Sequence, residues 1–303
     1  MRVFVTGGTG AIGRYAVPAL TGAGHSVSAL ARNEAKARLL RDQGATPVSV
    51  SLFDREGLKA AFAGHDAVLN LASAMPSTQQ FVLKSAWKEG HRVRAEGSAA
   101  VVAAALDAEV ARIVQESVVM IYRDGGDRWI DEDWPTDHFP IAAGNHAAEA
   151  NAGRFADRGG SAVILRFGIF YGHGAAHSEQ IMAMALQHIA FQAGAPRSYV
   201  SSIHLADAAG AVAAALECAG GTYNIVDDEP LTARENALAM ADAVSVKRWV
   251  SVPGRLALLL GERTTSVTRS LCVRNALFRS VTSWKPQYPS VREGYRAMAT
   301  MRK

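Results

Sequence analysis

The amino-acid sequence predicts an α/β protein built on a doubly wound parallel sheet, followed by a smaller C-terminal lobe. Three observations predict this fold. In the first half of the chain, short runs of β-branched residues alternate with segments whose apolar residues have helical spacing. A glycine-rich turn follows the first of these runs. The alternation of the two kinds of segment weakens after Gly172. Strands separated by helices form a parallel sheet that is covered on both faces. Right-handed crossovers then wind such a sheet in both directions.

The predicted elements follow one another in the order strand, helix, strand. Six predicted strands share a short run of β-branched or apolar residues, and they cover 2–6, 25–30, 47–52, 67–71, 112–115 and 161–165. Apolar spacing predicts helices over 14–23, 33–43 and 55–63, and a long helix over 81–106 that is interrupted near Gly90 and Gly97. Asp54 is expected to cap the third helix, because its carboxylate can accept hydrogen bonds from free amide groups there.

Composition excludes several classes of protein. The chain has 303 residues, 49% of them hydrophobic, which is enough for a large core and too many for a disordered protein. The net charge is +4, but the basic residues are scattered, so we expect no nucleic-acid partner. No apolar stretch is long enough to span a bilayer, so we expect no membrane partner. A strand pattern that begins at residue 2 argues against a signal peptide, and two cysteines make no disulfide framework. A cytoplasmic monomer or homodimer is expected.

The glycine-rich turn is the strongest local signal. Residues 6–13 read TGGTGAIG, between the first strand and the first helix. Gly7 permits a tight turn, Gly10 lets the backbone approach a pyrophosphate, and Gly13 lets the helix pack close to the sheet. The free amide groups of the helix start then attract the anion. In this context the turn predicts a Rossmann-type dinucleotide site.

The end of the second strand predicts which dinucleotide binds. An NAD site usually has an acid there, about 20 residues beyond the glycines, to bind the ribose 2′-hydroxyl. Here the stretch 30–33 reads LARN and offers Arg32 instead. A guanidinium suits a 2′-phosphate, so NADP(H) is the predicted cofactor. The alternative is that Arg32 is a solvated surface residue.

Seven segments resemble the extended short-chain dehydrogenase/reductase family, the group that contains NAD-dependent epimerases and dehydratases. They occur in the family's order along nearly the whole chain: 6–13, 67–73 (AVLNLAS), 113–122 (IVQESVVMIY), 165–172 (LRFGIFYG), 201–209 (SSIHLADAA), 221–227 (GTYNIVD) and 283–294 (SWKPQYPSVREG). The resemblance implies a cofactor domain over residues 1–170, completed by about 198–227. It also implies a substrate lobe over 171–197 and 228–303.

The resemblance further implies which residues contact the cofactor. The glycine turn would hold the pyrophosphate, Leu52 would lie near the adenine, segment 71–73 would line the groove and Phe167 would lie near the nicotinamide. With Arg32, the implied cofactor residues are Gly7, Thr9, Gly10, Ala11, Ile12, Gly13, Arg32, Leu52, Leu71, Ala72, Ser73 and Phe167.

The family's catalytic pair is missing from this sequence. The family places Tyr-x-x-x-Lys on the helix after the fifth strand, where the tyrosine exchanges a proton and the lysine lowers its pKa. Here no Tyr and no Lys occurs between Arg123 and Phe170. Only 7 of the 32 basic residues are lysines, and none of them lies between Lys88 and Lys247. A shift of register therefore cannot restore the pair.

Three other side chains are candidates for catalysis. Ser117 follows the fifth strand, one residue before the family's usual serine position, and is either a substrate hydrogen-bonder or a capping hydroxyl. Tyr122 lies just beyond that strand and can instead pack near the site. His146 lies on the helix that normally bears the tyrosine, and an imidazole titrates near neutral pH. The alternative for His146 is a surface or packing role.

No metal site is predicted. His173 and His177 are four residues apart, but Gly174 occupies the place where a zinc-protease motif has glutamate. The sequence thus predicts an NADP(H)-binding oxidoreductase or epimerase-like enzyme that acts on a small-molecule carbonyl or hydroxyl with a non-standard proton donor. Two alternatives stay open: a redox-neutral isomerase, lyase or cyclase on the same scaffold, and a non-catalytic NADP(H) sensor.

Overall fold

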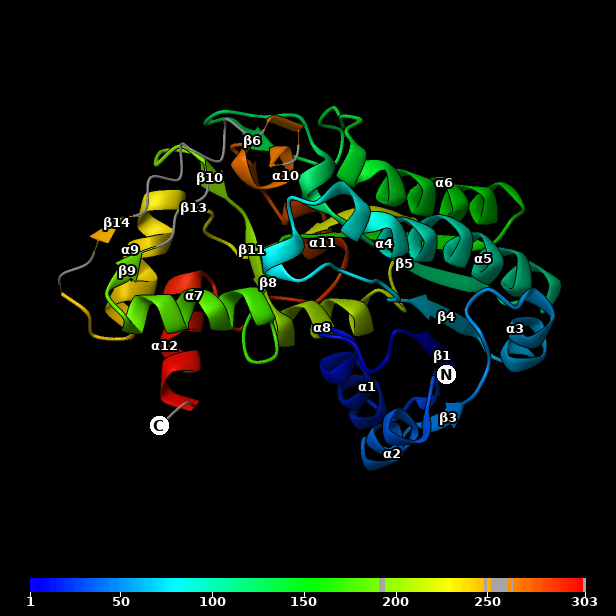
Figure 1. Ribbon diagram of the computed structural model, residues 1–303. Coiled ribbons are helices and arrows are strands. Elements are labelled where there is room, and N and C mark those ends of the chain that lie inside the picture. The colour runs from blue at the N-terminus through cyan, green and yellow to red at the C-terminus, as the bar shows by residue number, and fades with distance from the viewer. Residues whose placement is uncertain (191–193, 248–249, 252–260, 263, 302–303) are drawn as a thin grey trace.

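A seven-stranded sheet, parallel throughout, forms the centre of the molecule (Figure 1). The computed structural model describes residues 1–190, 194–247, 250–251, 261–262 and 264–301. The strand order is β12-β7-β5-β4-β1-β2-β3. The strands are β1 (Arg2–Thr6), β2 (Ser26–Leu30), β3 (Thr46–Val48), β4 (Ala67–Asn70), β5 (Arg112–Val118), β7 (Ser161–Phe167) and β12 (Gly221–Ile225). This order confirms the predicted doubly wound sheet, since β2 and β3 follow on one side of β1 and β4, β5, β7 and β12 follow on its other side.

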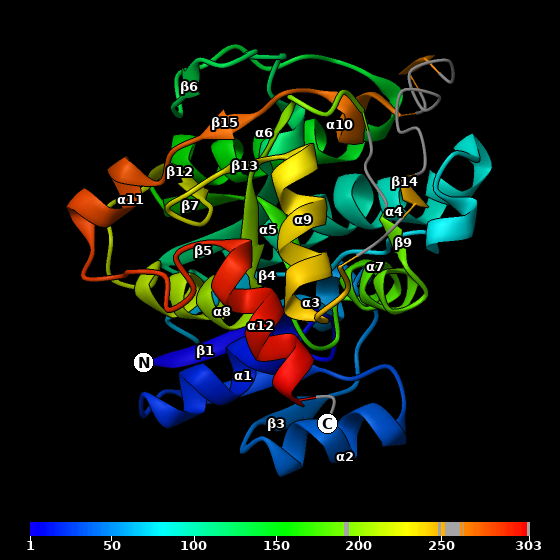
Figure 2. The same ribbon diagram turned by 90° about the vertical axis from the view of Figure 1, so that its left-hand side faces the viewer.

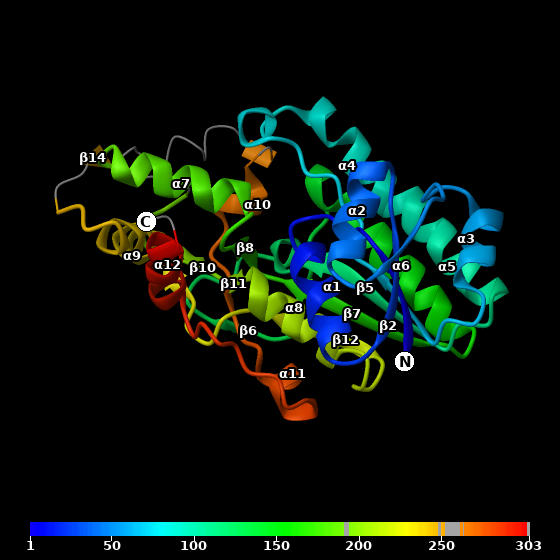
Figure 3. The same ribbon diagram turned by 90° about the horizontal axis from the view of Figure 1, so that it is seen from below.

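Helices cover both faces of the sheet, because successive strand residues point to opposite sides. Val3 and Val5 pack on one face, and Phe4 packs on the other. The first face is covered by α1 (Gly13–Gly22), α2 (Glu34–Asp42), α8 (Leu205–Ala214) and α11 (Ala276–Val281). The second face is covered by α3 (Arg55–Phe62), α5 (Ser98–Asp107) and α6 (Ala143–Asp157). Figure 3 shows the first face, with α1, α2 and α8 in front of the strands.

Several strand ends differ from their predicted ranges, and the largest differences are at the ends of β3 and β5. β3 stops at Val48, so Leu52 lies in the loop before α3 rather than in a strand. β5 continues to Val118, three residues beyond the predicted end, and therefore contains Ser117. The extension pairs along its whole length with β7. This pairing gives hydrogen-bond partners to backbone N–H and C=O groups that a shorter strand would leave without partners.

The long helix predicted over 81–106 is also shorter and more irregular. It is preceded by single turns at Thr78–Gln80 and η2 (Lys84–Trp87), and its regular part begins with α4 (Lys88–Arg92). A π-helical turn, η3 (Val93–Gly97), joins α4 to α5. The interruption near Gly97 is thus a π turn, a feature that is often found at functional sites.

The C-terminal lobe has its own apolar cluster. Three helices surround it, α7 (Ala176–Leu186), α9 (Ala233–Ala243) and α12 (Val291–Met301), as Figure 2 shows. Four small pairs of strands complete the described structure: β8 (Ile169–Tyr171) with β11 (Ser202–His204), β6 (Trp129–Ile130) with β15 (Cys272–Val273), β9 (Ile189–Ala190) with β14 (Val250–Ser251), and β10 (Tyr199–Val200) with β13 (Leu231–Thr232). A last short helix is α10 (Thr265–Thr268). Among the described helices, none is both long and apolar enough to cross a membrane.

Candidate cofactor and substrate site

The glycine turn forms a cradle that only glycine fits. Gly7 has φ = +74°, and a Cβ atom there would lie 2.5 Å from the carbonyl oxygen of Leu71. A Cβ atom on Gly13 would lie 2.2 Å from the carbonyl oxygen of Gly7. Ile12 precedes α1 and gives it no side-chain cap, so the first amide groups of the helix have no side-chain acceptor there. This is the donor set that a pyrophosphate requires.

The cradle lies at the point where the sheet reverses direction. β1 pairs with β2 on one side and with β4 on the other, so the carboxyl ends of β1 and β4 border the crevice. Leu71 and Ala72 follow β4 and lie against Gly7. The structure therefore brings the predicted residues of the turn and of segment 71–73 together. Thr9 and Ala72 are half-buried, and Gly10, Ala11 and Ser73 are exposed.

Other predicted cofactor residues lie further along the carboxyl edge. Leu52 is half-buried and packs against Gly97 of the π turn, where a Cβ atom would approach its Cδ2 to 2.7 Å. Phe167 ends β7 and is fully buried, with its ring centroid 5.2 Å from that of Phe170.

Arg32 is well placed to bind an anion. It directly follows β2 and is exposed, and it forms no ion pair with any residue that the structure describes. Its neighbour Asn33 is occupied, because the Asn33 side chain caps α2 by accepting from the Lys36 amide at 3.0 Å. The glycine cradle and the exposed guanidinium together fit a dinucleotide with a 2′-phosphate.

Helix α6 occupies the place of the family's catalytic helix. Its first turn is set by Pro140, which starts a 3₁₀ turn over Pro140–Ala142, and its alanine-rich sequence favours the helix that follows. Glu149 on this helix contacts both β5 and β7, whereas Asn151 bonds Ala95 and Ser98 beside α5.

Ser117 and Tyr122 belong to one buried polar network around Glu149. The Ser117 hydroxyl donates to Glu149 Oε1 at 2.6 Å, and Arg166 donates to both carboxylate oxygens at 2.9 and 2.8 Å. The Tyr122 hydroxyl donates to Asn224 Oδ1 at 2.8 Å and accepts from Arg166 Nη1 at 2.8 Å. Both hydroxyl-bearing residues are 0% exposed. Burial raises the pKa of Tyr122 to about 12.

His146 lies outside this network. Its Nε2 is 2.9 Å from the carbonyl oxygen of Asp137, so this nitrogen is the donor, and its ring centroid lies 4.2 Å from that of His138. The residue is half-buried. The structure therefore brings Ser117 and Tyr122 together, whereas His146 contacts Asp137 and His138 instead.

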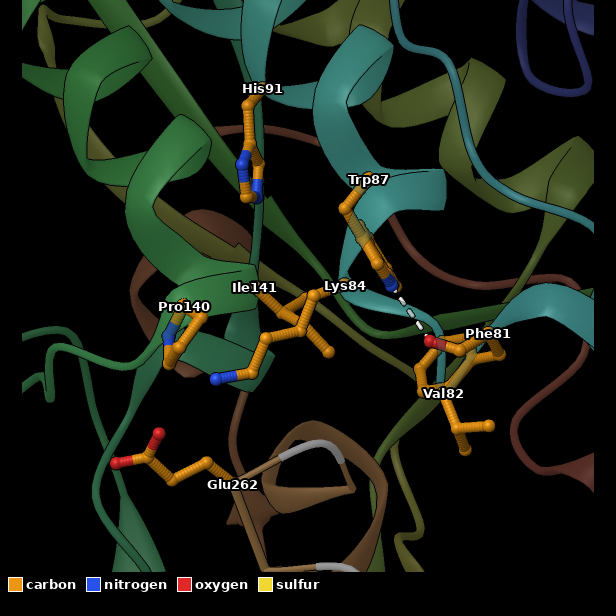
Figure 4. Close-up of a pocket in the computed structure, with 8 residues that line it drawn as sticks. All are labelled: Phe81, Val82, Lys84, Trp87, His91, Pro140, Ile141 and Glu262. Atoms are coloured by element: carbon orange, nitrogen blue, oxygen red, sulfur yellow. Dashed lines mark hydrogen bonds between the residues drawn. The ribbon is translucent and has the colours of Figure 1, made fainter.

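A small pocket opens between η2, α4 and the start of α6 (Figure 4). Its lining residues are Phe81, Val82, Lys84, Trp87, His91, Pro140, Ile141 and Glu262. The indole of Trp87 is fixed, because its Nε1 donates to the Phe81 carbonyl at 2.7 Å and its ring meets the Phe81 ring edge-on at 5.1 Å. Most of this wall is apolar.

Three buried side-chain nitrogens are unpartnered on His91, which lines the pocket, and on Arg94 and Asn145, which do not line it. His91 Nε2, Arg94 Nε and Asn145 Nδ2 are buried and have no hydrogen-bond partner among the described residues. Arg94 is otherwise held by Glu116, with Nη2 3.1 Å from Oε1. The helices can approach this closely because Gly144 has no side chain: a Cβ atom there would lie 3.1 Å from Arg94 Cβ and 3.3 Å from His91 Cα.

Sequence reasoning missed these residues. Glu149, His91 and Asn145 lie in no motif considered above, and Arg166 lies in segment 165–172 without a role having been predicted for it. One signal was available: two charged residues, Glu149 and Arg166, lie in segments predicted to be covered, and buried charges need partners.

The two histidines of the HGAAH segment do not converge on a common site. His173 is exposed and lies 3.4 Å from the Glu179 carboxylate, whereas burial lowers the pKa of His177. Within the described part of the chain, no group of three His, Cys, Asp or Glu side chains could hold a metal ion.

The fold and the glycine cradle define a Rossmann-type protein that binds a nicotinamide dinucleotide. The sequence model of the NAD(P)H-binding family matches residues 7–219. The chain belongs to this family.

Curated relatives include reductases. A 3-diazoavenalumate denitrifying reductase from a Streptomyces species is 31% identical over 97% of this chain and 99% of its own length. A 4-hydroxy-2-methyl-3-oxo-4-farnesyl-3,4-dihydroquinoline-1-oxide ketoreductase from Stigmatella aurantiaca is 38% identical over 50% of this chain and 44% of its own length.

Solved structures share the fold over the whole chain. A human epimerase family protein with NADPH has a TM-score of 0.82 at 22% identity and covers 99% of both chains. The UDP-glucose 4-epimerase of Thermus thermophilus with NAD has a TM-score of 0.78 at 23% identity, over 99% of this chain and 98% of its own. The predicted likeness to the epimerase/dehydratase group of short-chain dehydrogenases/reductases is confirmed.

Proposed function

We propose that this protein is an NADPH-dependent reductase of a small molecule. The observation that carries the proposal is the combination of the glycine cradle at Gly7 and Gly13 with the exposed guanidinium of Arg32, which has no ion-pair partner among the described residues. The cradle holds the pyrophosphate at the start of α1, and Arg32 holds the 2′-phosphate. Segment 71–73 and Phe167 border the rest of the groove.

Reduction of a carbonyl group requires a hydride and a proton. When bound, the reduced cofactor supplies a hydride, so a ketone would gain the hydride at carbon and one proton at oxygen and leave as an alcohol. The protein must therefore orient the carbonyl and deliver the proton. We propose His146 as the proton source, because it lies on α6, the helix that carries the proton donor in the family it resembles, and is half-buried. Ser117 and Tyr122 are the other two candidates, each held by protein partners.

The relatives support reduction more than a redox-neutral reaction. One full-length relative is named for a diazo compound, and a partial one for a ketone. We therefore propose either a carbonyl group or a diazo group as the group that is reduced. A small-molecule substrate, a monomer or homodimer and a cytoplasmic location belong to the same proposal.

The cofactor preference is tested by titrating NADPH and NADH and following protein fluorescence. NADPH is expected to bind at least about tenfold tighter than NADH, because a guanidinium–phosphate contact is charge-assisted. Arg32→Ala should remove the preference by weakening NADPH alone. Arg38→Ala, an exposed arginine on α2, is the matched control and should leave the ratio unchanged. Equal affinities in the unmodified protein would contradict the NADPH assignment.

The reductase activity is tested by the loss of NADPH absorbance with a panel of aryl ketones and aryl diazonium salts. The rate without protein is subtracted for each compound. Saturable consumption of NADPH with one compound class would support the proposal and choose between the two groups. A protein that binds NADPH tightly but consumes it with no compound would instead favour a sensor.

A further inference from the structure

Arg14 is the first cation after the glycine turn. It directly follows Gly13 on α1, and residues 6–13 contain no Lys and no Arg. Arg14 is exposed, and its guanidinium forms no hydrogen bond and no ion pair with any residue that the structure describes. A cation that the described part of the protein does not neutralise therefore lies at the start of α1.

The direction of the helix brings this side chain back toward the glycine cradle. Each Cα–Cβ bond of a helix is tilted toward the N-terminus, so a side chain covers the turn that precedes it. Before Arg14, that turn carries the amide groups of Ala11, Ile12 and Gly13, for which the described structure offers no backbone acceptor. The guanidinium of Arg14 can therefore reach an anion that these amide groups bind.

The loop between β8 and α7 lies against the same turn of α1. A Cβ atom on Gly174 would lie 3.0 Å from Arg14 Nη1, so the missing side chain leaves room for the guanidinium. The Tyr15 hydroxyl donates to the His173 carbonyl at 2.7 Å and attaches this loop to α1. Glu179 is an acid of this region, but its Oε1 accepts the Gly174 amide at 2.7 Å, and it forms no ion pair with Arg14 in the described structure.

A pyrophosphate needs more charge than the cradle supplies. The pyrophosphate of a dinucleotide is doubly negative, whereas the start of a helix contributes about half a positive elementary charge. Arg32 is proposed for the 2′-phosphate, at the adenosine end of the cofactor. A guanidinium suits phosphate oxygens because it forms charge-assisted hydrogen bonds with them, and Arg14 is placed to form these bonds at the pyrophosphate.

We propose that Arg14 binds the pyrophosphate of the cofactor. The amide groups at the start of α1 bind one side of this group, and the Arg14 guanidinium binds the side that faces the loop between β8 and α7. This inference rests on the proposed function, because it adds a residue to the same dinucleotide site. It divides the phosphates of NADPH between two arginines, Arg14 for the pyrophosphate and Arg32 for the 2′-phosphate.

The test uses ligands that carry the two groups separately. ADP-ribose contains the pyrophosphate without a 2′-phosphate, and adenosine 2′-monophosphate contains the 2′-phosphate without a pyrophosphate. Both compete with NADPH in a fluorescence titration of the full-length protein. Arg14→Met should weaken ADP-ribose, NADH and NADPH by a similar factor, about tenfold, and leave adenosine 2′-monophosphate unchanged. Arg32→Ala should weaken adenosine 2′-monophosphate and NADPH and leave ADP-ribose unchanged.

Three controls separate a phosphate contact from a structural role. Arg14→Lys keeps the positive charge and should retain most of the affinity for ADP-ribose. Arg154→Met removes an exposed arginine near the other end of α6 and should change the binding of no ligand. Urea unfolding of the ligand-free protein should be the same with and without Arg14→Met, because the guanidinium has no partner in the described structure.

Two results would overturn the inference. One is an unchanged affinity of Arg14→Met for ADP-ribose. The other is an equal loss of adenosine 2′-monophosphate, since the effect would then not be confined to the pyrophosphate. If the unmodified protein binds NADPH and either result is found, only the role of Arg14 is wrong and the proposed function stands. If the unmodified protein binds none of the four ligands, the proposed function fails together with this inference.

Discussion

Arg166 holds Glu149 by two parallel hydrogen bonds, 2.9 Å from Nε to Oε1 and 2.8 Å from Nη2 to Oε2. The pair joins the carboxyl end of the strand β7 to the helix α6. Their side chains are 10% and 13% exposed, so the two charges depend on one another. Glu149 also accepts the Ser117 hydroxyl, and thus one carboxylate fixes the helix, the strand β5 and the candidate serine in a common geometry.

Replacing Glu149 by Gln is expected to destabilise the protein by about 3 kcal/mol. The amide has nearly the same shape but leaves the Arg166 charge buried without a counter-charge, and breaking one side of a buried pair costs about this much. Urea unfolding followed by circular dichroism measures the change. Arg41→Ala, which breaks an exposed pair with Glu34, is the control and should have no measurable effect. A similar loss for both variants would contradict the special role of the buried pair.

Gly13→Ala is expected to lower NADPH affinity by more than about tenfold, because the added methyl would displace the turn that carries the pyrophosphate donors. Fluorescence titration of the cofactor measures this loss. Gly22→Ala, at the other end of α1, places its methyl where no atom lies within 4 Å. That variant should bind NADPH normally and gain up to about 1 kcal/mol of stability. Unchanged binding by Gly13→Ala would refute the cradle.

The buried carboxyl group of Asp227 should make the free energy of unfolding depend on pH. Burial raises the pKa of its carboxyl well above the ordinary value, so the folded protein holds a proton that the unfolded chain releases. The free energy of unfolding should therefore fall as the pH rises above about 4, until the raised folded pKa is passed.

Asp227→Asn removes this titration, so its stability relative to the unmodified protein should increase between pH 5 and pH 8. Burial lowers the pKa of His204 to about 4, which acts in the opposite direction, but this contribution is common to both proteins. Urea unfolding across the pH range measures the difference, and the exposed Asp242→Asn is the control. Parallel curves for the unmodified protein and Asp227→Asn would show that Asp227 does not titrate as proposed.

The proton source is tested by comparing three variants under conditions where NADPH is consumed. His146→Ala is expected to lower kcat by about 100-fold or more, because a general acid contributes a factor of about this size. Ser117→Ala and Tyr122→Phe should mainly cost stability, about 1–3 kcal/mol each, because they leave buried partners unsatisfied. If His146→Ala kept a normal kcat and Tyr122→Phe lost most of its kcat, the proton source would be Tyr122 and not His146.

The sequence by itself determined the sheet, the cofactor turn and the absence of the family's catalytic pair. These features are local: alternating periodicity specifies strands and helices, three glycines at fixed spacing specify one turn, and a missing residue type is visible without coordinates. The capping role of Asp54 is local too, and the structure confirms it, since Asp54 Oδ1 accepts from the Gly57 amide at 3.0 Å.

Only the tertiary structure decided what surrounds the catalytic helix. Ser117 meets Glu149 from 32 residues away, and Tyr122 meets Asn224 from 102 residues away. The ends of predicted elements were decided in the same way, since β5 runs on through Ser117 because β7 pairs with it. Such contacts depend on how strands and helices from distant segments pack, and a pattern within one segment contains no information about its partner.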